Sequence, residues 1–158
     1  MTADRELVAE TRIAASPEQV WAALTDFRRM ARWSPETVRM QPLLRGGLRV
    51  GQCYLGVNRR GPVVWPTRNV VRVVRPAQEL VWDTVTSGAR WIYRLEADGA
   101  GTRLEVRRPV PRRLTRMSGL FAGALLGGVA AHADELEDGM RQTLERLRGE
   151  VESAVGEH

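Results

Sequence analysis

The fold is decided by residues 89–108, which read ARWIYRLEADGAGTRLEVRR. Trp91, Tyr93 and Leu95 alternate there with polar or β-branched residues, and the half after the DGAG sequence at 98–101 alternates with charged residues in the same way. Because successive side chains of a strand point to opposite faces, this pattern predicts two strands that are each buried on one face. The glycine-rich turn between them predicts an antiparallel hairpin. We expect its inner face to carry Trp91, Tyr93, Leu95, Thr102, Leu104, Val106 and Arg108.

Further runs of β-forming residues lie upstream of this hairpin. Gly and Pro separate them at a spacing that is typical of an antiparallel meander. No strand pattern alternates with a helical pattern, so a doubly wound parallel sheet is disfavoured. The six expected strands are 37–44, 50–58, 63–74, 79–86, 89–97 and 102–110.

The two ends of the chain predict one more strand and three helices. Residues 6–14 alternate loosely and are expected to form a strand, and Ser16-Pro17-Glu18-Gln19 then supplies a cap and a first helical turn. A second short helix is expected over 26–33. Near the carboxyl terminus, apolar or small residues recur at steps of three and four and predict a long amphipathic helix. They are Met117, Phe121, Leu125, Val129, Leu136, Met140, Leu144, Leu147 and Val151.

Charge is distributed unevenly along the 158 residues. All 24 basic residues are arginine, and residues 28–116 hold 19 of them against 6 acidic residues, whereas residues 134–158 hold 3 against 8. A basic segment of this kind is compatible with nucleic acid or an anionic membrane as partner. Many of these arginines alternate with apolar residues, however, which indicates the solvated face of a sheet. The aromatic residues fall on the opposite face, so a base-stacking platform for nucleic acid is not expected.

Seven short motifs occur along the chain in the order ASPEQVW (15–21), WSPE (33–36), GxxYxGxN (51–58), WxT (65–67), WxYxL (91–95), GTRL (101–104) and GMRQTLERL (139–147). With this order of elements, the chain resembles the START-like, or SRPBCC, superfamily, and in particular its bacterial polyketide cyclase or dehydrase-type members. The resemblance implies an α+β helix-grip fold over a single domain, 1–158. In that fold a curved antiparallel β-sheet wraps around a long C-terminal α-helix, two short helices follow the first strand, and an apolar cavity lies between sheet and helix.

The resemblance departs from the aromatase/cyclases of the superfamily at two positions. Those enzymes carry an inward arginine and a tyrosine, and here Asn69 and Met40 stand near the corresponding places. This departure disfavours ring-forming cyclisation.

Strand alternation and the last helix together predict the interior. The interior is mainly aromatic with a few polar side chains, a composition that suits a pocket for a hydrophobic or polycyclic small molecule. The alternative is that the large aromatic residues only fill a core. His132 lies on the apolar stripe of the helix and is expected to point inward. The expected lining is Tyr54, Asn58, Trp65, Thr67, Asn69, Trp82, Trp91, Tyr93, Arg108 and His132, covered by Met117, Phe121, Leu125 and Val129.

Three classes of function are compatible with this interior. The first is binding of a hydrophobic or polycyclic small molecule in the cavity. The second is a polyketide cyclase/dehydrase-like enzyme that uses general acid/base chemistry, for which His132, Tyr93 and Asn58 are the candidate catalytic residues. The third is an interaction protein that uses the arginine-rich segment. Asp83 is a poor candidate base because its strand position points away from the cavity.

No metal or other cofactor is expected. Cys53 is the only cysteine, and no histidine-rich metal spacing, phosphate-binding glycine loop or Ser-His-Asp arrangement is present. The first ten residues lack the apolar run of a secretory signal, so a cytoplasmic location is expected. The uncharged run 117–131 is too short to span a bilayer. Contact with a membrane surface, assisted by Arg112, Arg113 and Arg116, stays open, as does the choice between monomer and homodimer.

Overall fold

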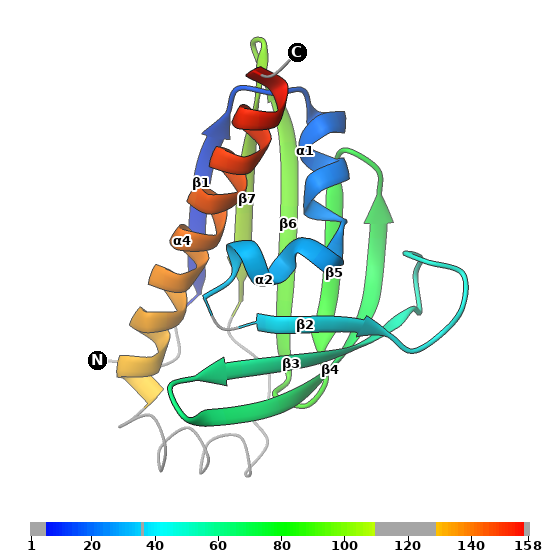
Figure 1. The fold of residues 1–158 in the computed structure, drawn as a ribbon, viewed down its shortest axis with the longest axis vertical. Helices are drawn as coiled ribbons and strands as arrows, with labels where there is room; N and C mark the ends of the chain where they lie inside the picture. Colours follow the sequence, from blue (N-terminus) through cyan, green and yellow to red (C-terminus); the bar gives the residue numbers. More distant parts are fainter. Residues whose placement is uncertain (1–5, 36, 110–128, 157–158) are drawn as a thin grey trace.

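A computed structural model describes residues 6–35, 37–109 and 129–156, with the side chains of the last range described from Asp134 onward (Figure 1). The elements follow the predicted order. They are β1 (Leu7–Ile13), α1 (Pro17–Leu24), the 3-10 helix η1 (Phe27–Arg29), α2 (Met30–Trp33), β2 (Thr37–Pro42), β3 (Cys53–Arg60), β4 (Val63–Arg75), β5 (Glu79–Thr84), β6 (Ala89–Asp98), β7 (Gly101–Arg108) and α4 (Val129–Gly156).

The seven strands form one antiparallel sheet in the order β1-β7-β6-β5-β4-β3-β2. It is the predicted meander from β2 to β7, closed by β1, which pairs with β7. The register shifts by one residue between Val71 and Val73 on β4, and such bulges bend a strand. Figure 1 shows the result: β2, β3 and β4 cross beneath α2, while β1, β7 and β6 run along α4. The helix-grip architecture is therefore confirmed.

Local signals fix the first helix as predicted. The Ser16 hydroxyl accepts a hydrogen bond from the Gln19 N–H, and the Gln19 side chain accepts one from the Ser16 N–H. This reciprocal pair is a capping box, and it satisfies two backbone donors that the first turn would otherwise leave unbonded. Pro17 occupies the first helical position, where its missing N–H costs nothing.

Helix α4 closes one edge of the sheet. Three of its glutamates, spaced seven and eight residues apart and so on one helix face, accept hydrogen bonds from β1 or from the residue that follows it. Glu137 accepts from the Val8 N–H at 3.2 Å, Glu145 from the Thr11 hydroxyl at 2.9 Å, and Glu152 from the Ala14 N–H at 2.8 Å. The Ala14 bond also lowers the pKa of Glu152. The Val8 N–H is a backbone donor that an open edge strand would present to another chain.

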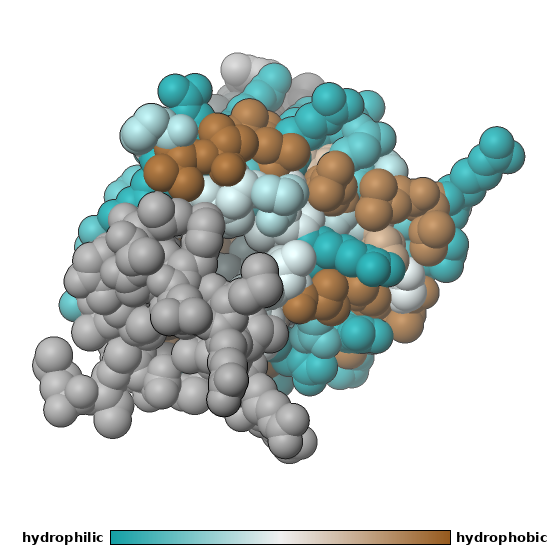
Figure 2. Space-filling model, turned by 90° about the horizontal axis from the view of Figure 1, so that it is seen from below, coloured by the Kyte–Doolittle hydropathy of each residue, from teal (hydrophilic) through white to brown (hydrophobic). Residues whose placement is uncertain are grey.

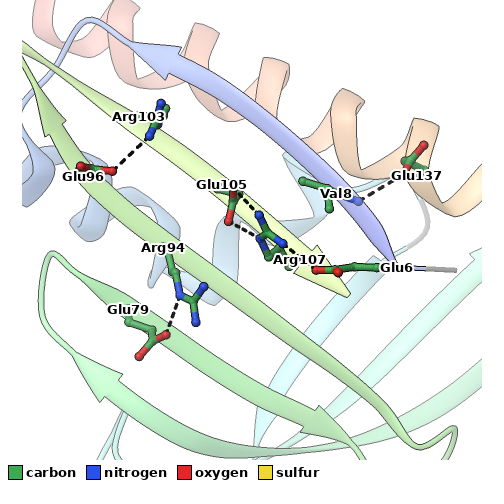
Figure 3. A network of polar contacts seen from close by, with 9 residues as sticks. All are labelled: Glu6, Val8, Glu79, Arg94, Glu96, Arg103, Glu105, Arg107 and Glu137. Carbon is green, nitrogen blue, oxygen red and sulfur yellow. Dashed lines mark hydrogen bonds and ion pairs between the residues drawn. The ribbon is translucent and has the colours of Figure 1, made fainter. Parts of the chain in front are cut away.

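The core lies between α4, the short helices and the inner face of the sheet. Met140, Leu144, Leu147 and Val151 of α4 are all buried, which confirms the predicted stripe over the described part of the helix. The outer face of β5, β6 and β7 carries arginines paired with acidic residues, as Figure 3 shows for Arg94 with Glu79, Arg103 with Glu96 and Arg107 with Glu6 and Glu105. These arginines lie on the solvated face of the sheet, as their alternation with apolar residues predicts.

Candidate functional site: a cavity between the sheet and the last helix

A cavity of about 600 Å³ lies between the inner face of the sheet and α4. Residues of α2, of strands β2 to β7 and of the first described turns of α4 line it. Figure 2 views the molecule from the end where α4 begins and shows a recess on this face. A volume of this size is in the range of pockets that enclose a small organic molecule.

Aromatic side chains form one wall of the cavity. Trp82 and Trp91 are directly paired across β5 and β6, and both point inward. The Tyr93 ring stacks on Trp82 with ring centroids 5.1 Å apart and an interplanar angle of 23°. The Arg108 guanidinium lies over the Trp91 indole, 5.5 Å from its centroid, a cation–π geometry. Trp65 adds a half-buried indole from β4.

A row of neutral polar side chains crosses the neighbouring strands β2 to β5. The Thr37 hydroxyl donates to Asn58 Oδ1 at 3.2 Å, and Asn58 Nδ2 donates to Thr67 Oγ1 at 3.2 Å. Asn69 Nδ2 donates to the same Thr67 oxygen at 3.2 Å, and the Thr84 hydroxyl donates to Asn69 Oδ1 at 2.6 Å. All five side chains line the cavity. The row is a connected network, which orders its members more than separate pairs would.

The absence of a side chain at Gly56 makes room for this polar row. Gly56 pairs with Met40 on one side and Thr67 on the other. A Cβ atom placed on it would lie 2.4 Å from Thr67 Oγ1, 3.0 Å from Asn69 Nδ2 and 3.2 Å from Met40 Sδ. Because real Cβ contacts are longer than the first of these, any larger residue would displace Thr67.

Tyr93 and Tyr54 are both buried, but only Tyr93 lines the cavity. Burial raises the pKa of Tyr93 far above its ordinary value, so its phenol keeps its proton and acts as a hydrogen-bond donor or acceptor, not as a base. Tyr54 instead packs edge-on against Phe27, with ring centroids 4.8 Å apart. Tyr54, which was expected in the lining, is not among the residues that line this cavity; it points inward, into the core beneath η1.

An ion pair borders the cavity where α4 begins. Arg60, at the end of β3, pairs with Glu135 of α4, and both side chains line the cavity. Asp138 also lines it and pairs with Arg141 at 2.7 Å. Arg60, Glu135 and Asp138 thus add charged groups to the lining, beside Arg108 on the aromatic wall.

Most of the predicted lining residues meet in this one cavity. Asn58, Trp65, Thr67, Asn69, Trp82, Trp91, Tyr93 and Arg108 all line it. Met117, Phe121 and Leu125 lie outside the described residues, and Val129 and His132 belong to α4 but their side chains are not described. Asp83 points outward as predicted, where Arg72 and Arg90 bind it at 3.0 and 2.7 Å and the Arg90 hydrogen bond lowers its pKa.

The sequence patterns did not identify several further lining residues. From the short helices and β2 they include Met30, Trp33, Thr37 and Met40, and from α4 they include Glu135, Asp138, Gln142 and Thr143. The α4 residues are polar and lie beside the apolar stripe, so helical periodicity alone assigns them to solvent.

In the described ranges, no group of three or more His, Cys, Asp or Glu side chains is placed to hold a metal ion. No helix there is long and apolar enough to cross a membrane.

The comparisons with known proteins agree with this architecture. A family model described as polyketide cyclase / dehydrase and lipid transport matches residues 4–152. No curated protein is significantly similar in sequence.

Solved structures share the fold at low identity. The Polyketide_cyc-like protein Cgl2372 from Corynebacterium glutamicum is 23% identical with a TM-score of 0.66, over 100% of this chain and 98% of that one. Protein NE0264 from Nitrosomonas europaea is 15% identical with a TM-score of 0.71, over the whole of both chains. The di-domain ARO/CYC StfQ from the steffimycin biosynthetic pathway is 14% identical with a TM-score of 0.72, over 97% of this chain and 53% of that one.

Proposed function

Because this chain belongs to the polyketide cyclase/dehydrase and lipid transport family, we propose that its cavity binds a hydrophobic or polycyclic small molecule. The observation that carries the proposal is the pairing of an aromatic wall with a row of neutral hydrogen-bonding groups around about 600 Å³ of space. Apolar pockets with a few convergent polar groups are the usual form of small-molecule sites.

The two walls suggest the chemistry of the ligand. Trp82, Trp91 and Tyr93 offer flat apolar surface, which suits rings or an extended chain. An amide can make four hydrogen bonds, and Asn58 makes two with Thr37 and Thr67, so donor and acceptor positions remain for a ligand. We therefore expect a mostly apolar ligand with a carbonyl or hydroxyl group near Asn58 and Thr67.

Phe121, Leu125 and His132 stay candidate ligand contacts, since they lie on the predicted continuation of the α4 stripe. Trp65 is proposed as a further apolar contact from β4.

Binding is better supported than turnover by the described lining. A cyclase or dehydrase needs a general base within reach of its substrate. Tyr93 keeps its proton, and Asn58 does not titrate. Among the described lining residues the carboxylates are Glu135 and Asp138, and both are in ion pairs. His132 remains the candidate base for the enzymatic alternative.

A fluorescent probe tests the proposal directly. N-phenyl-1-naphthylamine, a neutral fused-ring dye, should bind the protein with micromolar affinity, about −8 kcal/mol, and brighten. Thr143→Trp places an indole in the cavity from α4 and should abolish binding. Arg146→Trp adds the same group three residues along, at an exposed position, and should leave binding unchanged.

Native mass spectrometry of the purified protein should show a copurified ligand whose mass adduct is absent from Thr143→Trp. Dye binding that Thr143→Trp leaves intact, in a protein that melts like the wild type, would place the dye elsewhere and overturn the proposal.

A further inference from the structure

The loop between β2 and β3 exposes apolar side chains to solvent. Leu43 is 51% exposed, Leu44 47% and Val50 60%. Figure 1 shows the loop projecting from the side of the molecule away from α4, and Figure 2 shows apolar residues gathered on that side. Large apolar side chains that are grouped and exposed mark an interaction surface more often than scattered ones do.

A buried glutamine holds this loop in one shape. Gln52 is 0% exposed, and its amide oxygen accepts hydrogen bonds from the N–H groups of Leu44 and Cys53 at 3.1 and 3.0 Å. Its amide nitrogen donates to the carbonyl oxygens of Leu44 and Gly47 at 2.9 and 2.8 Å. All four hydrogen-bonding positions of the side chain are therefore used. The loop backbone is thus held in place from inside while the Leu43 and Leu44 side chains stay exposed.

The loop and the strands β2 to β4 beside it carry an excess of arginine, with Arg45 and Arg49 on the loop and Arg68 opposite Leu55 near it. Residues 37–78 contain eight arginines and no aspartate or glutamate. Arg45 and Arg49 lie on the loop itself and are exposed. On the described residues, no carboxylate pairs with the five arginines Arg39, Arg45, Arg49, Arg59 and Arg68. The outer face of β5 to β7 differs, since its arginines are matched by acids (Figure 3).

We propose that the β2–β3 loop, residues 43–50, docks the protein on an anionic lipid bilayer. Leu43 and Leu44 enter the boundary between headgroups and acyl chains, and Arg45 and Arg49 bind lipid phosphates. This combination of exposed leucines within a basic surface is the chemistry by which peripheral proteins bind anionic membranes. The site is separate from the cavity and does not depend on what the cavity holds.

The same observations argue against other partners. A second copy that met this loop through the same surface would bring its arginines against these arginines. Nucleic acid would match the arginines but leaves no role for outward leucines on an anchored loop, because phosphate contacts are made by charged and polar groups.

Vesicle cosedimentation tests the proposal. Wild-type protein is mixed at 0.1 M salt with vesicles of phosphatidylcholine alone or with 30% phosphatidylglycerol. It should sediment with the anionic vesicles and stay in solution with the neutral ones. Leu43→Ser/Leu44→Ser should weaken binding about tenfold or more. Arg45→Gln/Arg49→Gln should do the same, at about fivefold per arginine. Arg94→Gln/Arg103→Gln changes the net charge equally but on the acid-matched face, and should bind as the wild type.

An environment-sensitive dye shows whether the loop itself enters the bilayer. Cys53 is the only cysteine, so Leu44→Cys in a Cys53→Ser background takes a single nitrobenzoxadiazole label. Its emission should shift to the blue with anionic vesicles. Absence of wild-type binding, or equal loss in the Arg94/Arg103 control, would overturn the proposal, as would a loop-dependent complex with a short DNA duplex or a dimer abolished by Leu43→Ser/Leu44→Ser. Naphthylamine binding in every variant reports on the cavity, so failure of one proposal is separable from failure of the other.

Discussion

A single methyl group at Gly56 should test how the cavity is built. In Gly56→Ala the new Cβ would lie 2.4 Å from Thr67 Oγ1, closer than atoms in contact allow. Thr67 must then rotate or β3 must move away from β4. Either change breaks the two hydrogen bonds that Thr67 Oγ1 accepts from Asn58 and Asn69.

The expected cost follows from these contacts. Inserting a methyl group into a packed site costs about 1–3 kcal/mol. Each lost hydrogen bond costs about 1 kcal/mol more. Replacing Gly by Ala in a strand stabilises the native state by about 0.5–1 kcal/mol, because the unfolded chain has less conformational entropy. Gly56→Ala should therefore lower the free energy of unfolding by about 2–4 kcal/mol and weaken naphthylamine binding.

Urea unfolding at constant m-value measures this cost. The matched control is Gly149→Ala, since Gly149 is exposed in α4 and a Cβ there meets nothing within 4 Å. It should stabilise the protein by up to about 1 kcal/mol. The cost of Gly56→Ala should fall by about 1–2 kcal/mol in a Thr67→Ala background, where the clashing oxygen is gone. An equal cost in both backgrounds would refute the reasoning.

Three other predictions concern buried groups. Burial raises the pKa of both tyrosines of the chain, Tyr54 and Tyr93, so at pH 10 the native protein should show less tyrosinate absorbance at 295 nm than the urea-unfolded chain, which is about half ionised. Stability should fall as pH rises above 10, because the unfolded chain loses these protons at a lower pH than the native protein does; a flat profile would contradict the assignment. Gln52→Leu should cost about 2–4 kcal/mol in urea unfolding by leaving backbone groups of the β2–β3 loop unbonded, and wild-type stability would show that the anchor is dispensable. Leu144→Asp should cost more than about 3 kcal/mol by putting a charge at a position that is 1% exposed, whereas Arg146→Asp at an exposed position should change thermal stability little.

Strand alternation predicted the buried face of β6 because the two faces of each strand meet different surroundings. On β6, Tyr93 and Leu95 are buried while Arg94 and Glu96 are exposed, as expected. Alternation gives only the face, however, and the inner face of this sheet meets both a packed core and a cavity. Tyr54 belongs to the core because η1 brings Phe27 against it, a tertiary contact that no local pattern encodes.

Helical periodicity was less informative on the polar side of α4. The pattern places Glu145 among solvated residues, where a change to alanine would cost little. In the structure Glu145 accepts a hydrogen bond from Thr11, whose exposed fraction is only 7%. Removing it leaves a buried hydroxyl without its acceptor, so the cost should be near 1–2 kcal/mol. Some of the acidic residues near the carboxyl terminus therefore attach α4 to β1 by hydrogen bonds.

The basic segment 28–116 and the acidic segment 134–158 give the two edges of the sheet different charges. At the β1 edge, the glutamates of α4 bind the Val8 and Ala14 N–H groups, and α4 packs along the strand. At the β2 edge the nearby charges are arginines, and Arg39 lies on the edge strand itself. Two β2 edges would bring these arginines together, so like charge opposes pairing between copies, a common protection of open edges. The same charge attracts an anionic surface. One set of arginines can thus oppose edge-to-edge association and favour the lipid docking that we propose for the adjoining loop.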